Sequence, residues 1–344
     1  MPKQYQAYFR YAAHYQRVLF AAHRRYLRGG PEMKAALNTF DLEWNHIQNG
    51  HSWAAQNIEN FESAVRLCEQ YADVGAHLLE LRLVPTERIR WRHLALWAAI
   101  YFNNRSAEAI HLGNLGLAYA DLGSFRQAID CYEQALAIHR ELGNARGEGA
   151  ELGNLGAAYV ALGENAKAVP LHERCLEIQR QLNDRGGEAK SLGNLGLVYI
   201  NLGRVPQAIQ YLEQGLALHR EVGDLRSEAQ DLGLLGWAYH CGGKLPEAIE
   251  KYEAQWYLAC DLGDRREQTV SLGSLGNAYV DLEEYQRAFD CYERALEIDH
   301  DLGDRRGEGQ DLGNLGIAYA RSGELSKAIE FYEKFLNISR ELGD

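Results

Sequence analysis

The residues of this chain that could do binding chemistry are asparagines that recur at a spacing of 40 residues or a multiple of 40. They occupy the third position of one repeated phrase and are Asn114, Asn154, Asn194 and Asn314. Leu234 and Ser274 stand at the two intervening positions. A side-chain amide offers two donors and an acceptor, so a row of amides can hold the backbone of an extended peptide. The spacing therefore predicts peptide binding, and the alternative is that each amide bonds to a neighbouring helix.

Three residues after each of these positions the chain places a second set of candidate contact residues. The ones that we expect to form pockets for a partner's side chains are Leu117, Leu197, Trp237 and Asn277. Trp237 is the candidate anchor, since buried aromatic anchors dominate many interfaces, and the alternative is that it packs in the core. Asp121, His240 and Asp281 would set the charge of the same surface, which favours a basic partner segment.

Residue patterns that would support catalysis are missing from the sequence. Gly242-Gly243-Lys244 lacks the upstream glycine and the hydroxyl of a phosphate-binding loop. The 12 histidines form no His-x-x-x-His pair, and the six cysteines form no Cys-x-x-Cys pair. We therefore expect no enzymatic activity, no cofactor and no metal site. The cysteines are typical of buried thiols in a reducing compartment, which predicts a cytoplasmic protein.

The elements that position these residues follow from the repeated phrase, which is Leu-Gly-x-Leu-Gly. It occurs six times at intervals of 40, starting at Leu112, Leu152, Leu192, Leu232, Leu272 and Leu312. A constant period of this size indicates one supersecondary unit stacked on itself. Within a unit, apolar residues at spacings of three and four predict two helices, the first closed by Leu122-Gly123 and the second by Leu142-Gly143.

Glycine and alanine recur inside these predicted helices at fixed positions. Glycine in a helix costs about 1 kcal/mol relative to alanine, which is tolerable where a missing side chain lets two helices approach. We expect the second glycine of each phrase, such as Gly116, to face a small residue of the second helix, such as Ala128. The prediction is an all-α solenoid of antiparallel helical hairpins.

The pattern Leu115-Gly116, Tyr119, Ala128, Tyr132 and Ala135 resembles that of tetratricopeptide repeats, and it recurs six times. The family's usual repeat has about 34 residues. The 40-residue unit with Leu-Gly-Asn is similar to the repeats of Pins-type adaptors, kinesin light chains and bacterial signalling ATPases. The resemblance implies a right-handed superhelix whose first helices line a concave groove. It also implies that the matching asparagines hold a bound peptide there.

Residues 1–105 lack the phrase and are predicted to form a divergent helical region before the six repeats of residues 106–344. The stretch around Glu43, Asn45 and Trp53 resembles the start of the helical-repeat region in bacterial STAND-type ATPases and MalT-like regulators. The first predicted helix interleaves arginines with aromatic residues. It can be read as a nucleic-acid contact or, as we favour, as a capping helix with its arginines outward.

The charge of the chain is unevenly distributed. Its net charge is −12, and residues 106–344 carry 39 acidic against 23 basic side chains. This excess argues against general nucleic-acid binding and favours basic or neutral partners. No run of about 18 apolar residues predicts a membrane span. We therefore expect a non-catalytic adaptor or sensor that binds a protein segment, in bacterial signalling. The alternative is a structural solenoid that forms homo-oligomers through terminal repeats, where Phe331, Phe335 and Ile338 would be partly uncovered.

Overall fold

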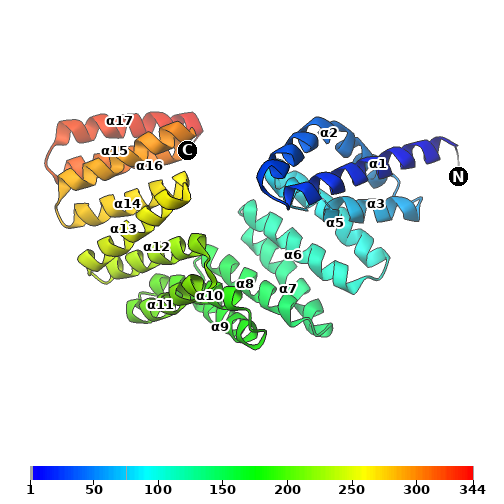
Figure 1. Cartoon of the computed structure of the whole chain (residues 1–344), viewed down its shortest axis with the longest axis horizontal. Helices are drawn as coiled ribbons and strands as arrows, with labels where there is room; N and C mark the ends of the chain where they lie inside the picture. The colour runs from blue at the N-terminus through cyan, green and yellow to red at the C-terminus, as the bar shows by residue number, and fades with distance from the viewer. Residues whose placement is uncertain (1–2, 75, 344) are drawn as a thin grey trace. The chain divides into compact units, whose positions relative to one another are not determined.

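The computed structural model describes residues 3–74 and 76–343, and these residues form 17 helices (Figure 1). The chain divides into two compact units, Met1–Glu164 and Asn165–Asp344, which we call unit 1 and unit 2. The helices of unit 1 are α1 (Lys3–Tyr26), α2 (Gly30–Gln56), α3 (Glu62–Val74), α4 (Ala76–Arg82), α5 (Pro85–Tyr101), α6 (Arg105–Asp121), α7 (Phe125–Glu141) and α8 (Ala145–Ala161).

Unit 2 contains nine described helices. They are α9 (Asn165–Gln181), α10 (Arg185–Asn201), α11 (Val205–Val222), α12 (Leu225–Cys241), α13 (Leu245–Leu262), α14 (Arg265–Asp281), α15 (Tyr285–Leu302), α16 (Arg305–Arg321) and α17 (Leu325–Leu342). Each helix packs on the next one along the chain, so α10–α11, α12–α13, α14–α15 and α16–α17 form successive hairpins (Figure 1). The predicted all-α fold of sequential antiparallel hairpins is confirmed. The boundary at residue 105 between a divergent region and the repeats stays a prediction.

The first helix of every repeat begins at a short polar side chain. An Asn or Asp oxygen accepts a hydrogen bond at 3.0–3.3 Å from the backbone N–H three residues further on. The six residues are Asn104, Asn144, Asp184, Asp224, Asp264 and Asp304. Because the first N–H groups of a helix have no partner within the helix, this bond fixes where each hairpin starts.

The turn between the two helices of a hairpin requires a left-handed residue. Five of the six repeats use glycine there, for example Gly243 with φ of 71°. The fifth repeat places Glu283 at the same position with φ of 62°. A residue with a Cβ is strained in this conformation, so Glu283 is a departure from the repeat that costs stability.

The second glycine of the phrase makes room for a large side chain of the second helix. A Cβ on Gly276 would lie 2.4 Å from the ring of Tyr292, and Gly116, Gly236 and Gly316 have the same relation to a tyrosine. The prediction named a small residue of the second helix as the neighbour of each glycine, whereas the atoms nearest to these four glycines are those of an aromatic ring. The alanines of the second helix, such as Ala128, are buried.

Residues 3–105 fold as helices around their own core. Tyr71, Phe40 and Trp91 are buried, and the Tyr71 hydroxyl donates to the backbone oxygen of Ala12 at 2.7 Å. The arginines of α1 are exposed, whereas Tyr5 is buried and Tyr15 is half-buried. This distribution fits the interpretation of α1 as an amphipathic packing helix.

Two further expectations concern the surface. On α17 Ile338 is buried, so the prediction that it is partly uncovered was wrong, whereas Phe331 and Phe335 are half-buried as expected. The exposed apolar side chains of this helix are Leu325, Ile329, Leu336 and Leu342. Across residues 3–74 and 76–343 no helix combines the length and the apolar character needed to cross a bilayer.

Candidate functional site

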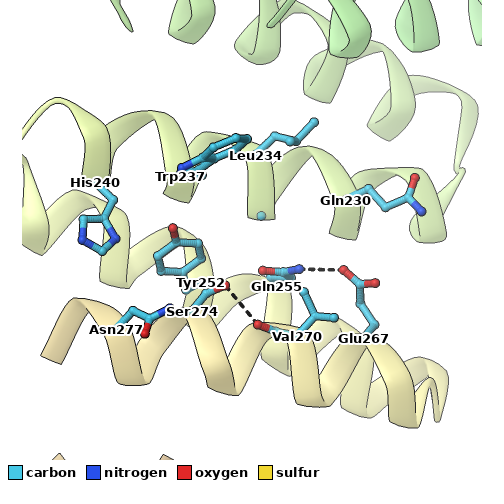
Figure 2. A pocket seen from close by; sticks show the side chains of 11 residues that line it. Gln230, Leu234, Trp237, His240, Tyr252, Gln255, Glu267, Val270, Ser274 and Asn277 are labelled. Carbon is cyan, nitrogen blue, oxygen red and sulfur yellow. Dashed lines mark hydrogen bonds between the residues drawn. The ribbon is translucent and has the colours of Figure 1, made fainter. Parts of the chain in front are cut away.

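A pocket of about 620 Å³ lies in unit 2 between two successive first helices. Its walls come from α12 and α14, and its floor comes from α13, as Figure 2 shows. We call it the Trp237 pocket after the largest side chain in its wall. Trp237 and Leu234 stand on α12, and Val270, Ser274 and Asn277 stand across from them on α14 (Figure 2).

The apolar walls of this pocket are accessible. Trp237 retains 39% exposure and Val270 retains 56%, although both lie among well-packed helices. Trp237 lies one helical turn from Leu234, so the two side chains share one face of α12. The structure thus places Trp237 at the surface, where an apolar side chain of another molecule can cover it.

The floor of the Trp237 pocket holds a polar group with an unused bonding position. Gln255 of α13 is only 3% exposed, and its Nε2 donates to Oε1 of Glu267 at 2.6 Å. Because the carboxylate only accepts hydrogen bonds, it fixes the amide with Oε1 as the free end. Among the described residues Oε1 of Gln255 has no hydrogen-bond partner. A buried unpaired acceptor is costly, so a ligand N–H at this point would be stabilised.

Two repeat positions build this floor: one holds Gln255, and the other holds Gly233, which leaves space for the amide. The equivalent of Gln255 in the other repeats is Ala135, Cys175, Gly215, Ala295 or Phe335. A Cβ on Gly233 would lie 2.7 Å from the Gln255 amide, so the first glycine of the phrase gives that amide its space. The analysis of the sequence missed Gln255. The signal was a polar residue at a position that is otherwise small or apolar.

The charged residues predicted at this surface pair with one another. His240 Nε2 lies 2.8 Å from Oδ2 of Asp281, and Arg321 donates to Oδ1 of the same carboxylate at 2.6 Å. The three residues come from α12, α14 and α16, so they connect three successive first helices. Arg321, followed by His240, holds the pKa of Asp281 below its usual range. This carboxylate is therefore ionised and already paired.

A second pocket, of about 330 Å³, lies on the other side of α14. We call it the Asp311 pocket. Val270, Ser274 and Asn277 line both pockets, and the walls unique to the second one include Asp299 of α15 and Asp311 and Asn314 of α16. Asn314, a member of the predicted amide row, thus lines the Asp311 pocket.

Asp299 and Asp311 form an acidic pair that the sequence analysis did not identify. Each is 5% exposed. Burial, with Asp299 and Asp304 nearby, raises the pKa of Asp311 to about 8. Burial also raises the pKa of Asp299. The signal in the sequence was the variable residue before each phrase, which is His111, Glu151, Ser191, Asp231, Ser271 or Asp311, and which is buried in every repeat.

Three of the four predicted site residues in unit 1 line a pocket there. Asn114, Leu117 and Asp121 stand on α6 beside a hollow of about 440 Å³ that also contacts Tyr26 and Arg88. Arg88 donates to Asp121 at 2.7 Å, so this acid, too, is paired within the chain. Leu117 retains 43% exposure.

The remaining asparagines are half-buried on α8 and α10. Asn154 donates to the Glu151 carboxylate at 3.3 Å, a bond within its own helix. Burial raises the pKa of Glu151 to about 7. Asn194 and Leu197 are half-buried on α10. In unit 2, Asn277 accepts a hydrogen bond from the Tyr292 hydroxyl at 2.7 Å, which occupies its oxygen.

In the described part of the chain, no group of three or more His, Cys, Asp or Glu side chains lies close enough together to hold a metal ion. All six cysteines are free, and Cys241 and Cys260 are exposed. Among the described residues, the buried polar atoms without a hydrogen-bond partner in the two pockets of unit 2 are Oε1 of Gln255 and Oδ2 of Asp311.

Comparison with known protein families gives one consistent result. A tetratricopeptide repeat profile matches residues 149–221, 187–254 and 267–341, which together make up more than half of the chain. A second tetratricopeptide repeat profile matches residues 109–142. A search of curated proteins found no match.

Solved structures of similar fold include regulatory proteins. A Rap protein complexed with Competence and Sporulation Factor is 16% identical with a TM-score of 0.57, over 97% of this chain and 99% of that one. Aspartyl phosphate phosphatase F from Bacillus subtilis is 13% identical with a TM-score of 0.63, over 95% and 93%. A STAND protein with a tetratricopeptide repeat sensor, from Pyrococcus horikoshii, is 18% identical with a TM-score of 0.61, over 91% and 47%.

Proposed function

We propose, from the premise that this chain belongs to the tetratricopeptide repeat family, that it is a protein-binding adaptor or sensor whose unit 2 captures an extended partner segment. One observation carries the proposal: the Trp237 pocket combines an exposed aromatic wall with the unpaired Oε1 of Gln255 in its floor. An apolar side chain and a backbone N–H are what a peptide brings together. No catalytic step is part of the proposal.

The wall and the floor would act on different parts of the segment. An apolar side chain laid against Trp237 and Leu234 removes apolar surface from water, which is worth roughly 25 cal/mol per Å². A backbone N–H donated to Gln255 satisfies the buried acceptor without reading the side chains. The asparagines of the repeated phrase would extend this backbone recognition, although Asn154 already bonds within the chain.

A setting in bacterial signalling is the finer part of the proposal. It is supported by the Rap protein complexed with Competence and Sporulation Factor and by aspartyl phosphate phosphatase F from Bacillus subtilis, both of which share the fold at low identity. The absence of enzymatic activity stays a prediction, because one structure of similar fold is an aspartyl phosphate phosphatase.

Affinity capture from native extract tests the proposal, with wild type compared with Trp237→Ala. Truncating a central aromatic anchor costs about 2 kcal/mol or more, so we expect the variant to lose the captured partner at equal loading. Tyr257→Ala is the matched control, because Tyr257 is a 61% exposed aromatic residue of α13 that does not line the pocket.

A second variant separates the two kinds of contact. It carries Asn114→Ala, Asn154→Ala, Asn194→Ala and Asn314→Ala and is checked for native helicity. Partner loss in this variant alone would move recognition to the amide row. Equal capture by wild type and both variants would overturn the proposal for this face of the molecule.

A further inference from the structure

The Asp311 pocket gathers three acidic side chains in its walls. Its walls hold Asp299, Asp304 and Asp311, and the one basic side chain that lines it is Arg306. Asp304 is already engaged, because its Oδ1 accepts the N–H of Gly307 at 3.0 Å as the cap of α16. Asp299 is hydrogen-bonded to Thr269, so Asp311 is the carboxylate of this pocket with an unpaired oxygen among the described residues.

Asp311 is buried with an oxygen that has no partner. It is 5% exposed, and among the described residues its Oδ2 makes no hydrogen bond. A buried carboxylate without a partner is strongly disfavoured, so Asp311 lacks a hydrogen-bond partner that a bound molecule could supply. In its ionised form the carboxylate needs a donor, and a cationic donor satisfies the charge as well, in place of the proton that the raised pKa of Asp311 otherwise keeps there.

Another repeat of the same chain shows what normally completes this arrangement. Asp231 stands at the position equivalent to Asp311, and His219 stands at the position equivalent to Asp299. His219 Nδ1 lies 2.7 Å from Oδ2 of Asp231, and both residues are buried. In the fifth repeat Asp299 takes the place of the histidine, so an acid faces Asp311 of the sixth repeat and the histidine partner is gone.

We propose that the Asp311 pocket receives a lysine or arginine side chain of the segment whose apolar side chain enters the Trp237 pocket. This inference rests on the function proposed above. A hollow of about 330 Å³ holds roughly ten water volumes of ~30 Å³ each, which suits one long side chain. A basic side chain fits better than a metal ion, because no metal-binding group of three ligands exists among the described residues.

The positions of the two pockets fix the spacing of the two side chains. The pockets share Val270, Ser274 and Asn277 and lie on either side of α14. Packed helices stand about 8–10 Å apart, and an extended chain advances about 3.3 Å per residue. The segment should therefore carry its basic residue about three positions from its apolar residue.

The experiment is a selection from a displayed random-peptide library on the full-length protein. It is run in parallel on wild type, Trp237→Ala, Asp311→Asn and Asp301→Asn. Asp301 is the matched control, because it is exposed, pairs with Arg265 at 2.8 Å and does not line the pocket. We expect wild type and Asp301→Asn to enrich peptides with an apolar residue and a basic residue about three positions apart. Asp311→Asn should enrich the apolar residue alone.

One selected peptide is then measured by fluorescence polarisation with its basic residue intact or replaced by glutamine. Removing the basic residue should weaken binding to wild type by about tenfold or more, as for close charge pairs at interfaces. The same replacement should leave the affinity for Asp311→Asn unchanged. This double comparison detects the pairing itself and is unaffected by a general change in stability.

Binding should also depend on pH. The titratable and charged groups near Asp311 are Asp299, Asp304, Arg306 and Tyr292, and α14 contributes only neutral side chains to the pocket. Burial raises the pKa of Tyr292, so this phenol stays neutral over the range tested. Because the pKa of Asp311 is raised to about 8, a bound cation displaces a proton. Affinity should rise from about pH 6 to about pH 9 for the basic peptide and stay flat for its glutamine version.

The outcomes separate the two proposals. Peptides that depend on Trp237 but lack a basic preference, or keep it on Asp311→Asn, would overturn the Asp311 proposal and leave the proposed function standing. A selection that enriches nothing on any protein, or enriches equally on Trp237→Ala, would overturn both.

Discussion

At the scale of single residues, Glu283 departs from the repeat, and we expect this departure to lower the free energy of unfolding. It occupies a left-handed turn with φ of 62° that five other repeats fill with glycine. Because a Cβ is strained there, Glu283→Gly should raise the free energy of unfolding by about 1 kcal/mol. Urea titration followed by circular dichroism measures the change. Gly243→Glu, at the equivalent position, should lower the same quantity, and an unchanged or lower stability for Glu283→Gly would contradict the argument.

Asp311 gives a second residue-scale prediction, on pH and stability. Its pKa is near 3.8 in the unfolded chain and about 8 in the folded one, so the folded state binds the proton more tightly. Stability is therefore lost as pH rises from about 4 through about 8. Asp311→Asn mimics the protonated acid, so it should flatten this dependence and stabilise the protein by about 1–3 kcal/mol at about pH 9.

Thermal unfolding of wild type and Asp311→Asn at about pH 5 and about pH 9 measures this effect. The two proteins should differ little at the lower pH and clearly at the higher one. A variant that is less stable than wild type at both would mean that the carboxylate is satisfied in the folded protein. At a functional site, a substitution often raises the stability of the fold while it removes binding of the partner.

At the scale of elements, α14 contains two glycines of the phrase with opposite surroundings. A Cβ on Gly276 would meet the ring of Tyr292 at 2.4 Å, whereas a Cβ on Gly273 meets nothing within 4 Å. Gly276→Ala should therefore cost about 1–3 kcal/mol through overpacking. Gly273→Ala should stabilise by up to about 1 kcal/mol through helix propensity.

The two variants control for each other, since they make the same chemical change three residues apart in one helix. Denaturant unfolding of both gives the comparison, because the linear extrapolation yields each free energy on one scale. Similar effects from the two substitutions would show that the helices adjust around Gly276, and that close approach to Tyr292 is not its role.

At the scale of the whole molecule, charge is the property that bears on partners. Residues 106–344 carry a net charge of −16, from 39 acidic and 23 basic side chains. A basic segment should therefore associate faster at low ionic strength, because the field steers its approach. Stopped-flow association at about 25 and about 300 mM salt should show a marked fall in rate for a basic peptide. A neutral version of the same peptide should show little change, and equal salt dependence for the two would rule out steering.

Much of the fold was predictable from local patterns. The interval between phrases gave the hairpins, and the Leu-Gly pairs gave helix ends within a residue or two of those observed, as at Asp121 and Glu141. Exposure at Leu117 and Trp237 also follows from their helical spacing. Local patterns suffice for these features, because a helix start, a turn or an apolar stripe depends on residues close in sequence.

The candidate site was predictable only in part. Trp237 was expected as a contact residue, but the neutralisation of Asp121 by Arg88 depends on a residue 33 positions away. The glycine of the phrase was expected to face alanine, whereas it faces Tyr132 in the first repeat. Such pairings depend on side-chain direction across two helices, which periodicity does not specify.

The sequence by itself determined that the chain is an array of helical hairpins with an acidic surface and a recurrent row of amides. Only the tertiary structure decided which polar atoms end without a partner, namely Oε1 of Gln255 and Oδ2 of Asp311. The physical reason is that desolvation and pairing arise where three helices from two hairpins meet. The free energy of burying each polar group therefore depends on neighbours that are distant in the chain.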